Sequence, residues 1–65
     1  MRTIFQGFAH ARDHAEIESR KQKEKDFYVI KIKSDGLQYA VIDDINSAKA
    51  GEKIMAHYKD GQIAK

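Results

Sequence analysis

The sequence predicts an α+β fold, with a small antiparallel sheet or barrel of about five short strands and one N-terminal helix. Two Asp-Gly pairs, at 35–36 and 60–61, each lie between segments rich in β-branched and aromatic residues, which is the strongest short-range hairpin signal. A stretch of good helix formers precedes the first of these hairpins. The 65 residues contain no internal boundary, so they are expected to form a single domain, 1–65.

The N-terminal third is predicted to form a strand over 2–6 and a helix over 8–25. Phe8, Ala11 and Ala15 have helical spacing, whereas the residues after Ile17 offer nothing apolar to bury, so the last turns should be exposed. A second interpretation remains open, in which residues 4–17 form strands and residues 19–26 form a charged loop.

The first hairpin is predicted to pair strand 27–33 with strand 37–43. A two-residue loop at Asp35-Gly36 gathers the apolar residues of one face into a core. That predicted core face consists of Tyr28, Ile30, Ile32, Tyr39 and Val41. A three-residue loop would set Lys31 opposite Tyr39 and mix the two faces. Because a one-residue slip turns side chains to the wrong side, the sequence favours the two-residue loop.

Apolar residues also fall on the opposite face of this predicted sheet. They are Phe27, Val29 and Ile42, and Met55 lies on the corresponding face of the last hairpin. The N-terminal segment could cover this patch, or the patch could be open. Exposed apolar patches rimmed by charge mark protein interfaces, so these four residues are the predicted partner-binding site.

The last hairpin is predicted to join strand 53–58 to strand 62–65 through Asp60-Gly61, with Tyr58 opposite Ile63. Between the hairpins, Asp44 or Asn46 can cap a single helical turn.

Composition restricts the class of protein. Charged residues make up 34% and hydrophobic residues 42%, which suits a folded domain. The absence of cysteine excludes a disulfide framework and a thiolate zinc site. No apolar run approaches the roughly 18 residues of a membrane span, and the N-terminus has no apolar signal region, so we expect a cytoplasmic protein.

A basic stretch at 20–25 supports a second hypothesis. Single-strand binders combine a cationic groove with aromatic platforms. The candidate nucleic-acid contacts are Arg20, Lys21, Lys23, Lys31 and Lys33. The net charge is only +2, however, and acidic residues interleave with the basic ones, which is typical of a solvated helix face.

Nothing in the sequence predicts catalysis, a cofactor or a metal site. His10 and His14 are four residues apart, but Ala11 stands where the zincin signature requires a glutamate as general base. None of the serines lies in a nucleophile-elbow context.

The sequence therefore predicts a non-enzymatic accessory or regulatory protein that binds another protein, of the kind of small inhibitor or modulator that phages and plasmids encode. Self-association into a homodimer is compatible with the same apolar surface. The alternative is a small-barrel module that binds nucleic acid.

Overall fold

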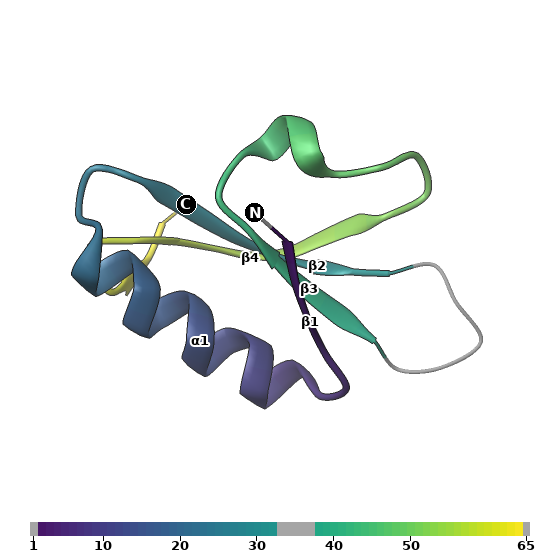
Figure 1. Cartoon of the computed structure of the whole chain (residues 1–65), viewed down its shortest axis with the longest axis horizontal. Helices are drawn as coiled ribbons and strands as arrows, with labels where there is room; N and C mark the ends of the chain where they lie inside the picture. Colours follow the sequence, from purple (N-terminus) through teal and green to yellow (C-terminus); the bar gives the residue numbers. More distant parts are fainter. Residues whose placement is uncertain (1, 33–37, 65) are drawn as a thin grey trace.

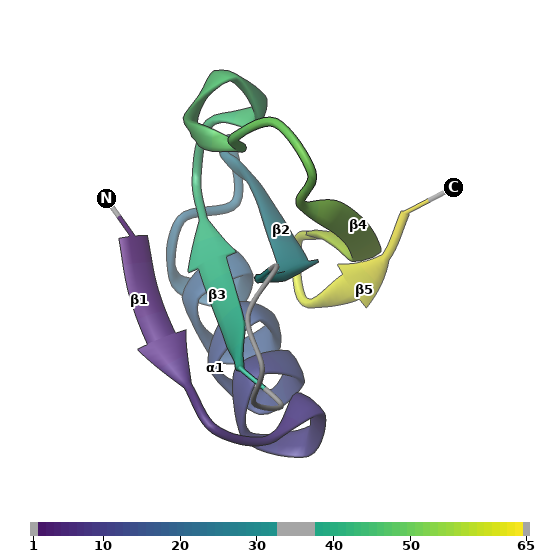
Figure 2. The ribbon, with the colours of Figure 1, turned by 90° about the vertical axis from the view of Figure 1, so that its right-hand side faces the viewer.

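A computed structural model describes residues 2–32 and 38–64 and shows an α+β fold with one α-helix and a five-stranded antiparallel sheet. The elements are β1 (Arg2–Phe5), α1 (Phe8–Lys21), β2 (Asp26–Lys31), β3 (Tyr39–Ile42), the 3₁₀ turn η1 (Ile45–Ser47), β4 (Lys53–Lys59) and β5 (Gln62–Ile63). The strand order is β1-β3-β2-β4-β5, so β1 and β5 lie at opposite edges (Figure 2). The sheet is therefore open and is not a closed barrel.

Helix α1 packs on one face of the sheet through small side chains. Ala11, Ala15 and Ser19, spaced four residues apart, are completely buried. The helix ends at Lys21, four residues before the predicted end, because no apolar residue after Ile17 holds another turn against the sheet. The alternative with strands over 4–17 is wrong from Phe8 onward.

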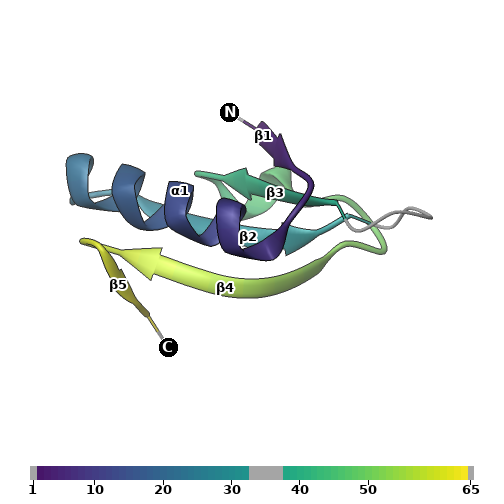
Figure 3. The same ribbon diagram turned by 90° about the horizontal axis from the view of Figure 1, so that it is seen from below.

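The larger core cluster lies between α1 and the sheet. It consists of Ala11, Ala15, Phe27, Val29, Val41 and Tyr58, with Phe5, Phe8, Tyr39 and Ala56 packed around it. Figure 3 shows α1 running along this side of the strands. Burial here raises the pKa of the Tyr58 hydroxyl above its ordinary value, because the phenolate would lose its solvation.

The opposite face of the sheet is also covered. Ile30, Ala40 and Ile42 are fully buried there, with Ala48 of the 43–52 segment packed against them. In Figure 1 this segment, which contains η1, arches over the side of the sheet opposite α1. The Asp44 side chain accepts a hydrogen bond of 2.9 Å from the Asn46 amide, which confirms the predicted cap.

The register of β2 and β3 corrects the sequence prediction. Lys31 pairs with Tyr39 and Ile30 with Ala40, as a three-residue loop requires, so the preferred two-residue register is wrong. The predicted core face is also wrong, because it mixes residues of the two clusters. The prediction assumed that one face is polar, but both faces are buried, so alternation alone does not select a register. The loop at 33–37 lies outside the described residues.

The closing hairpin agrees with the prediction. Tyr58 pairs with Ile63, and the loop residues Asp60 and Gly61 have φ values of 53° and 74°, as a type I′ turn requires. The Gly61 amide donates a 2.9 Å hydrogen bond to Ser19 Oγ, which ties the hairpin to the end of α1.

Candidate functional site

The predicted partner-binding residues do not form one surface. Phe27 and Val29 are buried under α1, and Ile42 is buried on the other face of the sheet. The N-terminal segment thus covers part of the predicted patch, which was one of the two alternatives. Met55 alone is accessible to a partner, with 41% of its surface exposed.

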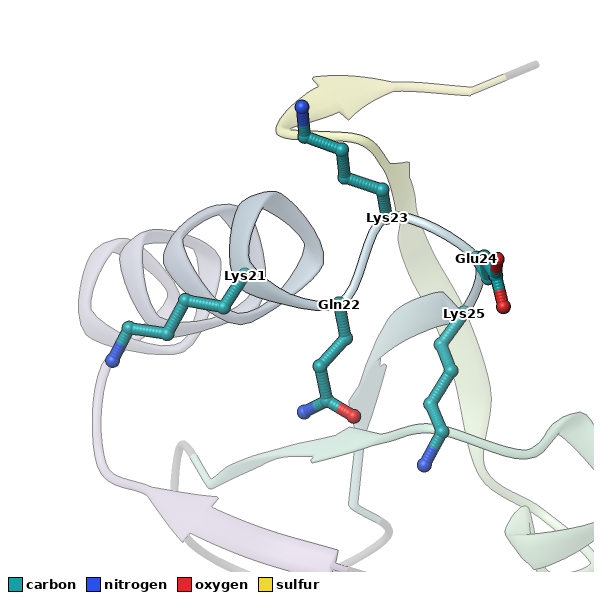
Figure 4. A pocket seen from close by; sticks show the side chains of 5 residues that line it. All are labelled: Lys21, Gln22, Lys23, Glu24 and Lys25. Atoms are coloured by element: carbon teal, nitrogen blue, oxygen red, sulfur yellow. The ribbon is translucent and has the colours of Figure 1, made fainter.

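The basic stretch surrounds the end of α1 and the turn that follows it. Arg20 pairs with Glu16 at 2.8 Å, Lys21 with Glu18 at 3.8 Å, and Lys25 with Asp43 at 3.7 Å. Figure 4 shows the side chains of Lys21, Lys23 and Lys25 pointing in different directions. These cations are partly neutralised and do not converge on a single anion.

The structure also separates the two groups of candidate nucleic-acid contacts. Lys25 immediately precedes β2, and Lys31 is the last residue of that strand. At about 3.3 Å per residue, the two positions are about 20 Å apart. Lys33 lies outside the described residues. The aromatic side chains do not form an open platform either, because Phe27 is buried and the Tyr28 ring stacks on His57 at 4.4 Å.

The histidines occupy separate environments. The His14 ring lies 5.1 Å from the Phe5 ring, and His57 Nε2 is 2.9 Å from a carboxylate oxygen of Asp26. Over residues 2–32 and 38–64, no group of three histidine, aspartate or glutamate side chains is arranged to hold a metal ion.

The sequence pointed to Met55 but not to its neighbour Ile54, nor to the strand edge that the two residues share in the first half of β4. Strand β5 pairs with Tyr58 and Lys59, and Ala64 donates to the His57 carbonyl oxygen, so the described part of the last hairpin covers β4 from His57 onward. We call residues Lys53–Ala56 the open β4 edge, because within the described chain they have a strand neighbour, β2, on one side only. Unpaired strand edges are templates for another chain.

Two large apolar side chains are exposed on the open β4 edge. Ile54 is 44% and Met55 41% exposed. The register between β2 and β4 shifts here, because Val29 pairs with Ala56 and Ile30 with Ile54, which leaves Met55 as a bulge residue. A bulge limits uncontrolled edge-to-edge pairing. The sequence offered one signal for this site, since apolar residues at 54 and 55 interrupt strict alternation.

Ile54 is one end of an apolar row that crosses the sheet. The strand register places Ile4, Ala40, Ile30 and Ile54 side by side on the face opposite α1. The two central residues are fully buried, whereas Ile4 is 56% exposed at the other edge. The 43–52 segment therefore covers the centre of this face and leaves its flanks open.

Arg2 fastens the 43–52 segment to β1. Its guanidinium donates a hydrogen bond of 3.1 Å to the Ser47 carbonyl oxygen. It also forms an ion pair with Glu52, whose side chain is only 5% exposed. Glu52 also accepts a hydrogen bond of 2.7 Å from the Lys49 amide. The hydrogen bond from Arg2 holds the pKa of Glu52 below its ordinary value, although burial opposes this shift.

Comparisons add no functional assignment. No family model, curated protein or solved structure matches this chain. Within the described residues, no helix is long and apolar enough to cross a membrane. The function must therefore be inferred from the surface itself.

Proposed function

We propose that this chain is a non-enzymatic accessory protein that binds another protein, and that the open β4 edge is its contact surface. The observation that carries the proposal is the exposure of Ile54 and Met55 on a strand edge that has no second strand neighbour among the described residues. An extended segment that joins such an edge gains main-chain hydrogen bonds, and its side chains fit the flanking surface.

The energetics favour contact through these apolar side chains. Fully burying an isoleucine or methionine side chain contributes about 1.5–3 kcal/mol. Ile54 and Met55 are already partly buried, so their remaining gain is smaller, about 1–2 kcal/mol each. Interface energy is concentrated in a few such residues, and a small edge can therefore give measurable affinity.

The test compares two exposed isoleucines. Ile54→Gln removes apolar contact from the open β4 edge, and Ile17→Gln makes the same change on the outer side of α1, where Ile17 is 51% exposed. We expect the wild type and Ile17→Gln to retain the same proteins from a lysate of the source cells. Ile54→Gln should lose them, while circular dichroism shows that both variants are folded.

Nuclease treatment of the lysate examines the alternative function. Retention that disappears after this treatment would support binding to nucleic acid through the basic residues. Retention that is equal in both glutamine variants would show that the open β4 edge is not the contact surface.

A further inference from the structure

Two lysines lie directly opposite each other at one end of the open β4 edge. The register pairs Lys31 of β2 with Lys53 of β4, and both are exposed. Cross-strand partners point to the same face, and like charges placed this way are destabilising. Within the described chain, neither lysine forms an ion pair. No carboxylate of residues 2–32 and 38–64 therefore compensates their repulsion.

Residues 49–56 do not supply a free negative charge beside Lys53. Glu52 is the single carboxylate among residues 49–56, and Arg2 engages its nearly buried side chain. Lys49, on the same segment, is exposed and adds a further positive charge. The open β4 edge thus combines an apolar site with a cationic one that no described carboxylate neutralises.

We infer that the open β4 edge binds an extended protein segment in which acidic and apolar residues alternate. This inference rests on the proposed function and names the chemistry of the partner. Successive residues of a strand point to opposite faces. Lys53 shares its face with Lys31, and Ile54 shares the other face with Ile30. A strand added at this edge would set acidic residues next to Lys53, with Lys31 one strand further away, and apolar residues next to Ile54.

A second copy of this chain fits the edge less well. The corresponding edge of a second copy brings the same lysine pair and the same engaged Glu52. A symmetric pairing through this edge would therefore add positive charge without an exposed carboxylate from residues 49–56. Charge complementarity favours an acidic partner over self-association.

The experiment uses the isotope-labelled protein and three probes. The first is a short, end-capped peptide that alternates glutamate and valine, the second alternates lysine and valine, and the third is an oligothymidine. Amide shifts of Lys53–Ala56 report binding at the edge, and titration gives each Kd. We expect the glutamate–valine peptide to shift these amides and the other two probes to leave them unchanged.

Two double variants distinguish the effect of the local lysine pair on binding from the effect of the net charge of the protein. Lys31→Gln with Lys53→Gln removes the opposed pair, and Lys21→Gln with Lys23→Gln makes the same charge change beyond the far end of β2. We expect the first variant to bind the glutamate–valine peptide roughly three- to tenfold more weakly, from the loss of the cross-strand ion pair at Lys53 and of the weaker attraction of Lys31, which lies one strand further away. The second should bind like the wild type.

The alternative outcomes overturn different statements. Equal binding of both peptides at the open β4 edge would exclude the acidic preference and leave the proposed function intact. Binding of the oligothymidine at these amides would show that negative charge is sufficient for binding at the open β4 edge. The partner would then not need the apolar residues that the inference requires. Unchanged amides with every probe would contradict both the inference and the assignment of the edge as a contact surface.

Discussion

The two faces of the sheet are covered in different ways. On one face a 14-residue helix contributes Ala11, Ala15 and Ser19, and nearly all contacts are packing contacts within a continuous core. On the other face the 43–52 segment contains only the three-residue turn η1, and side chains hold it in place. The helix satisfies its own backbone groups, whereas an irregular segment depends on partners such as Arg2 and Glu52.

The irregularly covered face carries an apolar row whose two ends are exposed. The 43–52 segment protects Ala40 and Ile30 but does not reach the two ends of the row, Ile4 and Ile54. The incomplete cover leaves apolar surface at the open β4 edge, which is the contact surface that we propose.

The largest expected effect comes from a charge under the helix. Val29→Lys places an unpaired ammonium group at a position that is 0% exposed beneath α1. Burying such a charge costs several kcal/mol, and a domain of this size has a total stability of only about 3–5 kcal/mol. We expect circular dichroism to show global unfolding.

Lys31→Gln is the matched control, because residue 31 lies two positions further along β2 on the same face and is exposed. It should stay folded. A folded Val29→Lys protein would mean that α1 can leave the sheet without loss of the remaining structure.

A smaller effect is expected where the 43–52 segment is fastened. Arg2→Gln removes the ion pair with Glu52 and weakens the contact with the Ser47 carbonyl oxygen. Because the Arg2 side chain is 24% exposed, water compensates in part, and we expect a loss of about 1–2 kcal/mol in urea unfolding.

Hydrogen exchange tests whether the two covers open independently. In Arg2→Gln, amides such as Ser47 and Ala48, which donate within η1, should lose protection, whereas those of α1 should lose less. An equal loss in both regions would show that the two covers open together.

The sequence predicted the number, type and order of the main elements well, because their signals are local. Asp60-Gly61 is an example, since the preference of this pair for positive φ determines the register of the last hairpin. The start of α1 and its small buried residues also follow from local spacing.

The sequence did not predict the register of the first hairpin or the exposed site. Phe27, Tyr28, Val29 and Ile30 are consecutive apolar residues, so both possible registers bury apolar side chains. The register depends on what covers each face, which is a long-range property. The open β4 edge is similarly non-local, because it depends on where β5 stops and on the bulge at Met55.

The smallest expected effect is a pH dependence on the irregularly covered side. The pKa of Glu52 lies below its ordinary value of 4.5, since Arg2 stabilises the carboxylate in the folded state. The unfolded chain therefore binds the proton more readily. The resulting stability is fully present above pH 4.5 and is lost as the pH falls through the lowered pKa.

Glu52→Gln isolates this contribution, because glutamine keeps the shape of the side chain and does not titrate. Urea unfolding at several values between about pH 5 and pH 3 should show that the wild type loses more stability than the variant as the pH falls. The two proteins share every other titrating group, so the difference between their slopes reports Glu52 alone. Parallel slopes would mean that the Arg2–Glu52 pair does not fasten the 43–52 segment in solution.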